Sequence, residues 1–281
     1  MSTVDSVRHD SSVVITLNNP DSFNALAPNM IDEFIAAARD AAADRSCRAI
    51  VITGEGEKAF CAGIDVKSVA ARDASRDAAV GDQLDPVAAG FENLHHHLSS
   101  MIRTLHTLPI PVIAAVNGHA IGAGFALAAA SDLRVAGDNV KFADGFIRRG
   151  ISGCELGLSY FLPKLVGASI AFDWMMTGRR VGADEASRAG LIGQVVAPEQ
   201  TVATALELAK SIAELAPMAV SMTKEVMWSN LHAASLDQAL ALEGRTQAMT
   251  RTTSDAAEAR LAFLQKRPPV FGQPDRPRIV R

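Results

Sequence analysis

The sequence has few cysteines and no large excess of charge of one sign, and both absences exclude classes of protein. Its 281 residues include only Cys47, Cys61 and Cys154, an odd number without the spacing of a metal site. This argues against a disulfide framework and is typical of a protein in a reducing cytosol. The formal net charge of −4 excludes a global basic field of the kind that attracts nucleic acid or a membrane surface.

The chain also lacks the features of an exported or membrane-spanning protein. Residues 1–5 contain no basic stretch followed by an apolar one, so we expect no signal peptide and a cytoplasmic location. The apolar stretch Ile110–Ala130 has the length of a membrane span, but polar residues and glycine interrupt it at 117–119. We therefore interpret it as a strand, a turn and a helix.

Two short segments carry most of the chemical information. They are Phe60–Asp65, Phe-Cys-Ala-Gly-Ile-Asp, and Asn117–Gly124, Asn-Gly-His-Ala-Ile-Gly-Ala-Gly. Each follows an apolar run typical of a buried strand, at Ala49–Thr53 and Val112–Val116. The second segment leads directly into an apolar helix, and a helix start leaves N–H groups without partners and carries partial positive charge. Two such groups that converge would hold an oxyanion, so the pattern predicts a site for an enolate, for which a thioester is the obvious source.

The order of the remaining patterns predicts an α/β core followed by helices only. We expect the core over residues 1–200 and a helical C-terminal region over 201–281, and we find no repeat in the sequence. The segment Ser68–Ala89 has little apolar periodicity and is interpreted as surface chain that shapes the acyl pocket. The predicted strands are Val13–Leu17, Ala49–Thr53, Val112–Val116, Leu133–Ala136, Val140–Phe142 and a strand ending at 195–196. The predicted helices are Pro28–Ala43, Val87–Leu108, Phe125–Ala130, Gly157–Val166, Ser169–Thr177, Ala183–Ala189, Thr201–Leu215, Pro217–Trp228, Ser235–Met249 and Ser254–Lys266.

Together these motifs resemble the enoyl-CoA hydratase/isomerase (crotonase) superfamily. The resemblance rests on both glycine turns, their separation and flanking strands, and on Asn24–Leu26 and Glu258–Arg267, and it covers roughly residues 10 to 270. It implies a crotonase-like α/β spiral of ββα units with a helical C-terminal trimerisation region. It also implies an acyl-CoA thioester as ligand, with coenzyme A as part of the substrate rather than a separate cofactor. No metal is expected, and the implied assembly is a homotrimer or a dimer of trimers.

The resemblance assigns the oxyanion hole to the backbone N–H groups of Ile64 and Ala123. Ala62, Gly63 and Gly122 belong to the same two turns and contact the substrate. Because both roles belong to the backbone, the Ile and Ala side chains do not interfere. If only one of the two motifs were present, its glycines could be explained as residues that permit a tight turn. The presence of both motifs in this register favours the oxyanion hole.

Four more residues are assigned to substrate or to turn structure. Lys67 follows the first motif, and Phe263 and Lys266 match family positions that contact coenzyme A from a neighbouring subunit. Helix packing is the alternative for Phe263, and a solvated basic helix end is the alternative for Lys266. We expect Asp65 to hold its turn by bonding backbone N–H groups.

The sequence departs from the hydratases of this family at two positions. Those enzymes use two glutamates to add water, and the matching residues here are Ala126 and Phe146. Hydration needs a base for the water and an acid for the α-carbon, and neither side chain can transfer a proton. Ordinary hydratase activity is therefore not expected, and Phe146 becomes a candidate for lining the acyl site.

One carboxylate partly compensates for this loss. Glu155 aligns with the nucleophilic aspartate of the chlorobenzoyl-CoA dehalogenase pattern, and an acidic residue of dienoyl-CoA isomerases falls within one position of it. In an apolar pocket its pKa would be raised, which suits proton shuttling, although a helix N-terminal cap is the alternative. Asp144 is interpreted either as a turn aspartate or as a second acid.

The function we favour is therefore double-bond isomerisation of an acyl-CoA, with Glu155 as the proton shuttle. One alternative is an atypical enoyl-CoA hydratase, a lyase of fatty-acid oxidation. Another is thioester hydrolysis or dehalogenation, with Glu155 attacking or activating water, and with a histidine from the 95–97 run. The last alternative is a non-catalytic protein that binds acyl-CoA and has kept only the two turns.

Overall fold

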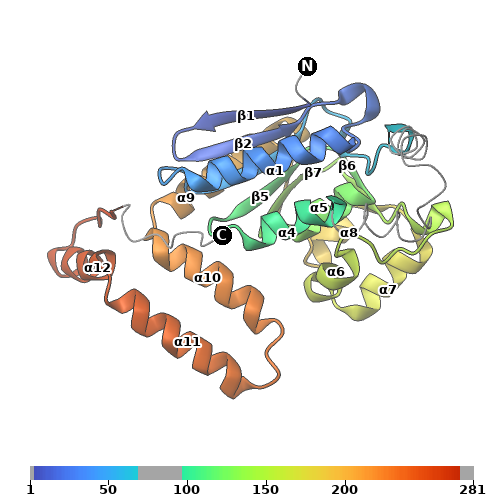
Figure 1. The fold of residues 1–281 in the computed structure, drawn as a ribbon. Helices are drawn as coiled ribbons and strands as arrows, with labels where there is room; N and C mark the ends of the chain where they lie inside the picture. Colours follow the sequence, from blue (N-terminus) through green and yellow to red (C-terminus); the bar gives the residue numbers. More distant parts are fainter. Residues whose placement is uncertain (1–2, 69–96, 273–281) are drawn as a thin grey trace, which may run out of the picture.

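A six-stranded sheet forms the centre of the molecule (Figure 1). The computed structural model describes residues 3–68 and 97–272. Across the sheet the strands are β1 (Val4–His9), β2 (Ser12–Leu17), β3 (Ala49–Gly54), β5 (Val112–Val116), β7 (Leu133–Gly137) and β10 (Gln194–Val196). β1 pairs with β2 antiparallel, and every other neighbouring pair is parallel.

The three central strands read as continuous apolar runs because both of their faces are covered. Cross-strand partners form rows that alternate between the faces. One row comprises Ile15, Ile52 and Ala114, and the next comprises Val14, Val51 and Ile113. The first row packs into the larger core with helix α1 (Pro28–Ala43), and the second packs under α9 (Thr201–Ala213) on the opposite face.

There is a second, smaller sheet. After each of three neighbouring strands of the large sheet, the chain continues into a strand of this small sheet. It contains β4 (Ala59–Cys61), β6 (His119–Ile121), β8 (Lys141–Ala143) and β9 (Val181–Gly182). The pairs β3–β4, β5–β6 and β7–β8 each take the chain from the large sheet to the small one, where β4, β6 and β8 lie parallel. Successive turns after the short strands are therefore brought side by side, which is the predicted spiral, built without any repeat in the sequence.

Helices complete the core below the sheets. α4 (Ser99–Thr107) and α5 (Ala123–Ala130) pack against each other, and α6 (Leu158–Val166) packs on α5. α7 (Ala168–Thr177) and α8 (Ala183–Arg188) follow, with short 3₁₀ turns η1 (Pro20–Ser22), η3 (Ile147–Arg149) and η4 (Pro198–Gln200). The predicted strands and helices of the described chain are confirmed to within a few residues at their ends. The segment Ser68–Ala89 lies almost wholly outside the described residues, as does the first part of the helix predicted at Val87–Leu108.

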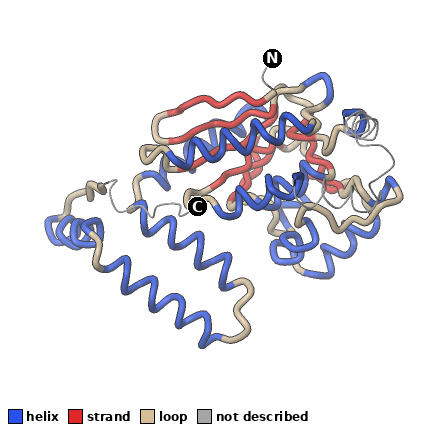
Figure 2. Tube along the Cα trace, viewed as in Figure 1, coloured by secondary structure: helices blue, strands red, loops and turns tan. Residues whose placement is uncertain are grey.

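The last helices leave the core as an arm. Figure 2 shows that α10 (Pro217–Asn230), α11 (Leu236–Arg251) and α12 (Ser254–Gln265) are joined by short loops and carry no strand. α11 buries none of its residues in this chain. α9 packs on the large sheet, whereas α10–α12 extend away from it (Figure 1).

A buried ion pair attaches α10 to the core. Lys224 Nζ lies 2.8 Å from Asp132 Oδ2 and donates to the carbonyl oxygens of Leu105 and Ile110 at 3.0 and 3.1 Å. Asp132 also accepts from Trp228 Nε1 on α10, at 2.8 Å. The Lys224 and Asp132 side chains are only 7% and 15% exposed, so solvent screens this pair weakly.

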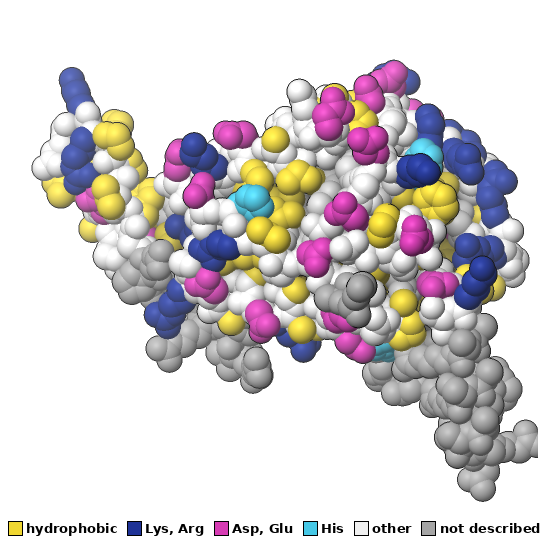
Figure 3. Space-filling model, turned by 90° about the horizontal axis from the view of Figure 1, so that it is seen from above, with side chains coloured by type: hydrophobic (Ala, Val, Ile, Leu, Met, Phe, Trp, Pro, Cys, Tyr) yellow, Lys and Arg dark blue, Asp and Glu magenta, His cyan; other side chains and the backbone are white. Residues whose placement is uncertain are grey.

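On the face shown in Figure 3, acidic side chains are spread over the middle and basic side chains gather mainly toward the two ends, so both signs of charge are present. Among the described residues, no helix combines the length and the apolar character that crossing a membrane requires.

We expect Lys224→Met to lower the free energy of unfolding by about 3 kcal/mol, because it leaves the Asp132 charge buried without its cation. Urea denaturation at fixed protein concentration measures the change. The matched control is Arg8→Met, which breaks the exposed Arg8–Asp44 pair and should cost less than about 1 kcal/mol. Equal losses in the two variants would contradict the role given to the Lys224 pair.

Candidate active site

The first glycine turn is held in place by the segment Asn24–Leu26. Leu26 N donates to Gly63 O at 2.7 Å, and Asp65 N donates back to Leu26 O at 3.0 Å. The Asn24 side chain donates to Ala59 O at 2.8 Å and to Glu55 O at 2.9 Å. These bonds use the carbonyl oxygen of Gly63 and the N–H group of Asp65, on either side of Ile64, and leave the N–H group of Ile64 itself available.

The second turn places Gly122 directly before α5. Gly122 has φ +53° and ψ −113°, a conformation that L side chains rarely adopt, and its N–H donates to Ala143 O at 2.9 Å. Ala123 is the first residue of α5, so its N–H has no intrahelical acceptor. Within the described chain, neither Ile64 N–H nor Ala123 N–H donates to any acceptor.

The two turns touch each other through backbone. A Cβ on Gly63 would lie 3.0 Å from Ile121 O and 3.6 Å from Ala123 N. A Cβ on Gly124 would lie only 2.1 Å from Cys61 O. The glycines are therefore required by the close approach of the turns, and this approach brings the two predicted donors into one place.

α5 gives this place a strongly oriented field. All eight of its residues are buried, so the positive end of the helix at Ala123 faces the interior with little solvent screening. At the other end, Arg134 donates to the carbonyl oxygens of Ser131 and Ala128 at 2.5 and 3.3 Å. Burial lowers the pKa of Arg134 to about 10, which still leaves it charged at neutral pH. This cap is not among the features predicted from the sequence, although a charged residue within an apolar strand is a signal for it.

Asp65 supports the first turn. Its Oδ1 accepts from the backbone N–H groups of Lys67 and Ser68 at 3.1 and 3.4 Å, as expected, and its Oδ2 accepts from the Ser68 hydroxyl at 2.5 Å. The Ser68 hydroxyl is the main cause that lowers the pKa of Asp65. Lys67 is exposed beside this turn, and its contact with coenzyme A stays a prediction.

Apolar side chains occupy the two positions where hydratases of the family have glutamate. Ala126 on α5 is fully buried, and Phe146 is 5% exposed. The Phe146 ring would lie 3.5 Å from a Cβ on Gly122, so it packs directly on the second turn. The structure thus places an aromatic wall beside the two free amides.

Glu155 lies in the loop between η3 and α6, and it does not cap α6. The N-cap of α6 is Gly157, which receives no side-chain bond. Glu155 Oε1 is buried and has no hydrogen-bond partner within the described part of the chain. Burial is the main cause that raises the pKa of Glu155, and the nearby charge of Asp144 raises it further. The capping alternative is therefore not supported, and the side chain keeps an oxygen free for proton transfer.

His97 has a partner of its own, and of the two cysteines beside the motifs Cys61 is buried and Cys154 is exposed. His97 Nε2 lies 2.9 Å from Asp32 on α1, while His95 and His96 lie outside the described residues. Cys61 is fully buried, and burial raises the pKa of its thiol to about 12, which suits packing rather than nucleophilic attack. Across residues 3–68 and 97–272, no group of three or more metal-ligating side chains is found.

Phe263 and Lys266 lie on the arm, far from the two turns of their own chain (Figure 1). Phe263 is 83% exposed, so the alternative of helix packing within this chain is wrong. Lys266 is also exposed, at the end of α12. Contact of either residue with coenzyme A bound to a neighbouring subunit stays a prediction.

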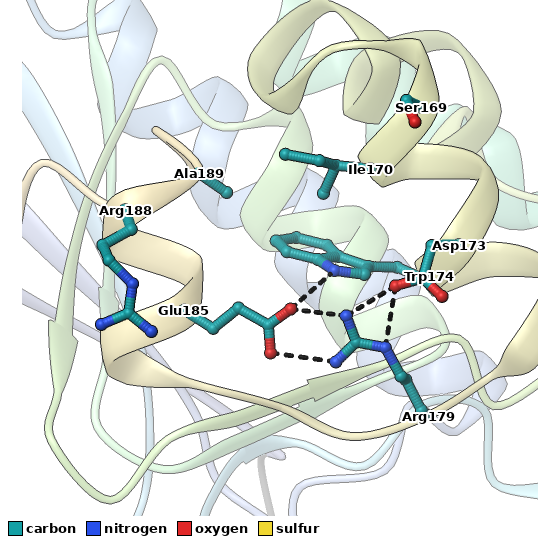
Figure 4. A pocket seen from close by; sticks show the side chains of 8 residues that line it. All are labelled: Ser169, Ile170, Asp173, Trp174, Arg179, Glu185, Arg188 and Ala189. Carbon is teal, nitrogen blue, oxygen red and sulfur yellow. Dashed lines mark hydrogen bonds and ion pairs between the residues drawn. The ribbon is translucent and has the colours of Figure 1, made fainter.

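A pocket of about 400 Å³ between α7 and α8 is built around an ion-pair network (Figure 4). Arg179 pairs with Asp173 at 2.6 Å and with Glu185 at 2.5 Å, and Trp174 Nε1 donates to Glu185 at 3.3 Å. None of the predicted site residues lines this pocket, and Arg179, Asp173 and Glu185 satisfy one another, whereas Arg188 stands apart from this network. It is therefore a structural junction between the two helices.

Comparison with known proteins agrees with this geometry. A family model described as enoyl-CoA hydratase/isomerase matches residues 8–274. A probable enoyl-CoA hydratase of Mycobacterium tuberculosis (strain ATCC 25618 / H37Rv) is 39% identical over 260 residues, which are 92% of this chain and 88% of that protein. The short-chain-enoyl-CoA hydratase of Clostridium acetobutylicum is 32% identical over 254 residues, 90% of this chain and 91% of that protein. The crystal structure of a probable enoyl-CoA hydratase/isomerase from Mycobacterium abscessus has a TM-score of 0.86 and 37% identity, covering 97% of this chain and 99% of that one. The predicted resemblance and fold are confirmed.

We expect Gly124→Ala to lower thioester turnover by about 10²-fold or more, because the new methyl group must push Cys61 O away and separate the two amides. Steady-state kinetics on an acyl-CoA substrate measure the effect. Gly244→Ala is the control, since a Cβ there meets nothing within 4 Å and should leave turnover unchanged. Wild-type turnover in Gly124→Ala would show that the contact between the turns is not needed.

Proposed function

We propose that this chain, which belongs to the enoyl-CoA hydratase/isomerase family and is therefore an acyl-CoA-processing enzyme, moves the double bond of an enoyl-CoA thioester. In this proposal the thioester carbonyl oxygen binds between the N–H groups of Ile64 and Ala123. Negative charge develops on that oxygen as the enolate forms. Two preorganised donors at a buried helix start stabilise this charge more strongly than water does.

Glu155 is the proposed proton shuttle. For a 3-enoyl-CoA, its carboxylate removes a proton from C2, so that a C–H bond breaks and a dienolate forms against the two donors. The resulting carboxylic acid then returns the proton to C4, and the double bond lies between C2 and C3. No water is added, so one carboxylate is sufficient.

The observation that carries this proposal is the buried Oε1 of Glu155, which has no hydrogen-bond partner among the described residues, while both positions matched to hydratase glutamates hold apolar side chains. A raised pKa makes Glu155 a stronger base than an exposed glutamate. Ala126 and Phe146 leave no other proton-transfer group at the positions that hydratases use.

Coenzyme A enters this proposal only as part of the substrate. We assign its contacts to Lys67 and, from a neighbouring subunit, to Phe263 and Lys266. The exposure of Phe263 supports this assignment, because a large aromatic side chain without cover in its own chain is suited to an interface. The proposed assembly is a homotrimer or a dimer of trimers in the cytoplasm.

Atypical hydration is the second candidate, and two observations favour it. The compared relatives from M. tuberculosis and C. acetobutylicum are named hydratases. Asp144 also supplies a second buried carboxyl group beside Glu155. Hydration would give a 3-hydroxyacyl-CoA, which differs from an isomerised product by one water.

We expect Glu155→Gln to lower kcat for 3-enoyl-CoA isomerisation by at least about 10²-fold while acyl-CoA binding persists, because the amide cannot accept the proton. In the wild type, activity should fall as pH decreases through the raised pKa of Glu155, since the base becomes protonated. Kinetics over a panel of 2-enoyl-, 3-enoyl- and dienoyl-CoA thioesters, with product masses, test both points.

Glu207→Gln is the control, a matched change at an exposed glutamate of α9. Unchanged turnover in Glu155→Gln would eliminate the proton shuttle. Products heavier by one water would favour hydration, and acyl-CoA binding without any turnover would favour a binding protein.

A further inference from the structure

We infer that Asp144 is a positioning residue for Glu155, and that the two carboxyl groups form a coupled pair that holds one proton between them over a range of pH. In this pair Asp144 carries the negative charge and Glu155 exchanges the proton. The inference rests on the proposed function for the role of Glu155 in catalysis, but the coupling itself is a property of the two side chains.

Asp144 occupies the junction between the second glycine turn and the loop of Glu155. It directly follows β8, whose last residue, Ala143, accepts the N–H of Gly122. Its Oδ1 accepts from Phe146 N at 3.0 Å, which is the bond expected of a turn aspartate. Its Oδ2 has no partner in the described chain, and the residue is fully buried. A side chain that only held the turn would leave its second oxygen in water, so the burial of Oδ2 needs another explanation.

Gly153 shows what lies against that oxygen. A Cβ on Gly153 would lie 2.2 Å from Asp144 Oδ2 and 3.1 Å from its Cγ. The φ of Gly153 is not in the left-handed region, so space rather than backbone conformation requires glycine here. The loop that carries Glu155, two residues later, is thus packed directly on the Asp144 carboxyl group.

The surroundings of the two carboxyl groups differ. Burial raises the pKa of both, but the backbone N–H groups of Phe146 and Ile147 act in the opposite direction on the pKa of Asp144. Glu155 Oε1 receives no such donor from the described residues. Asp144 is therefore better able to remain ionised, and Glu155 is better able to hold the proton.

Among residues 3–68 and 97–272, no side-chain cation forms an ion pair with Asp144 or Glu155. Arg148 Nε donates to Gly178 O at 2.6 Å, and Arg179 is held by Asp173 and Glu185. The carbonyl oxygen of Met175, near the C-terminal end of α7, lies 3.4 Å from the same Cβ position on Gly153 and adds negative potential. The charged and polar groups on the adjoining segments therefore leave the repulsion between the two carboxyl groups in place.

The coupling has a direct consequence for the chemistry. When Glu155 takes the C2 proton, an O–H bond forms, and the repulsion from Asp144 is relieved. When Glu155 returns the proton to C4, that bond breaks, and Asp144 has neither gained nor lost a proton. A negative neighbour thus makes Glu155 a stronger base without joining the transfer.

We expect Asp144→Asn to move the acidic limb of the pH profile of kcat/KM to lower pH by about one unit, because the negative charge is removed. The kcat on the plateau should also fall, since Glu155 becomes a weaker base. Asparagine keeps the Oδ1 acceptor for Phe146 N, which preserves the turn. Asp138→Asn, a matched change at an exposed aspartate between β7 and β8, should leave the limb where it is.

A titration without substrate separates this inference from the proposed function. Carboxyl ¹³C NMR on the full-length protein labelled at glutamate would follow Glu155, assigned by the signal lost in Glu155→Gln. The expected result is a titration above that of ordinary glutamates in the wild type, moving about one pH unit lower in Asp144→Asn. If the Glu155 signal titrates at the same pH in Asp144→Asn as in the wild type, the coupling is overturned. The same holds if the acidic limb does not move in Asp144→Asn although Glu155→Gln is inactive. A moved signal with full activity in Glu155→Gln would leave the coupling intact and reject the shuttle.

Discussion

The contact between the two glycine turns is the constraint on which the rest of the site depends. Cys61 O and the backbone of Gly124 are so close that no side chain fits between them. Because β4 and β6 are parallel neighbours in the small sheet, the turn after each strand reaches the same edge. Leu26 in the segment Asn24–Leu26 then bonds the carbonyl oxygen of Gly63 and the N–H group of Asp65, on either side of Ile64. What remains is a pair of backbone N–H groups, at Ile64 and Ala123, that have no acceptor within the described chain.

The apolar surroundings decide how the carboxyl groups near this pair behave. Phe146 packs on Gly122, and Ala126 lies buried one turn into α5, so the side chains at these two positions are apolar and carry no ionisable group. In such surroundings an ionised carboxylate is costly, which is why burial is the main cause of the raised pKa of both Asp144 and Glu155. The replacement of two glutamates by apolar residues thus changes the properties of the acids that remain.

Much of this architecture could be predicted from sequence because it depends on strong local patterns. Continuous apolar runs identified β2, β3 and β5, and helical spacing after Pro28 identified α1. β1 was missed because Val4–His9 exposes five of its six residues. β4 and β6 were missed because they fall at the two segments interpreted as glycine turns, and β9 was missed because it has only two residues. The free oxygen of Asp144 could not be predicted, since it depends on how closely the loop at Gly153 approaches from a distant part of the fold.

The shortness of α5 gives Arg134 a wider importance than a helix cap. Eight residues span only about 12 Å, so the negative pole of the helix lies close behind the Ala123 N–H group and would oppose the positive pole there. A guanidinium on the terminal carbonyl groups masks that pole. With its negative end neutralised in this way, a helix of about two turns provides a positive potential at its N-terminus. Without the guanidinium, a much longer helix would be needed for the same potential.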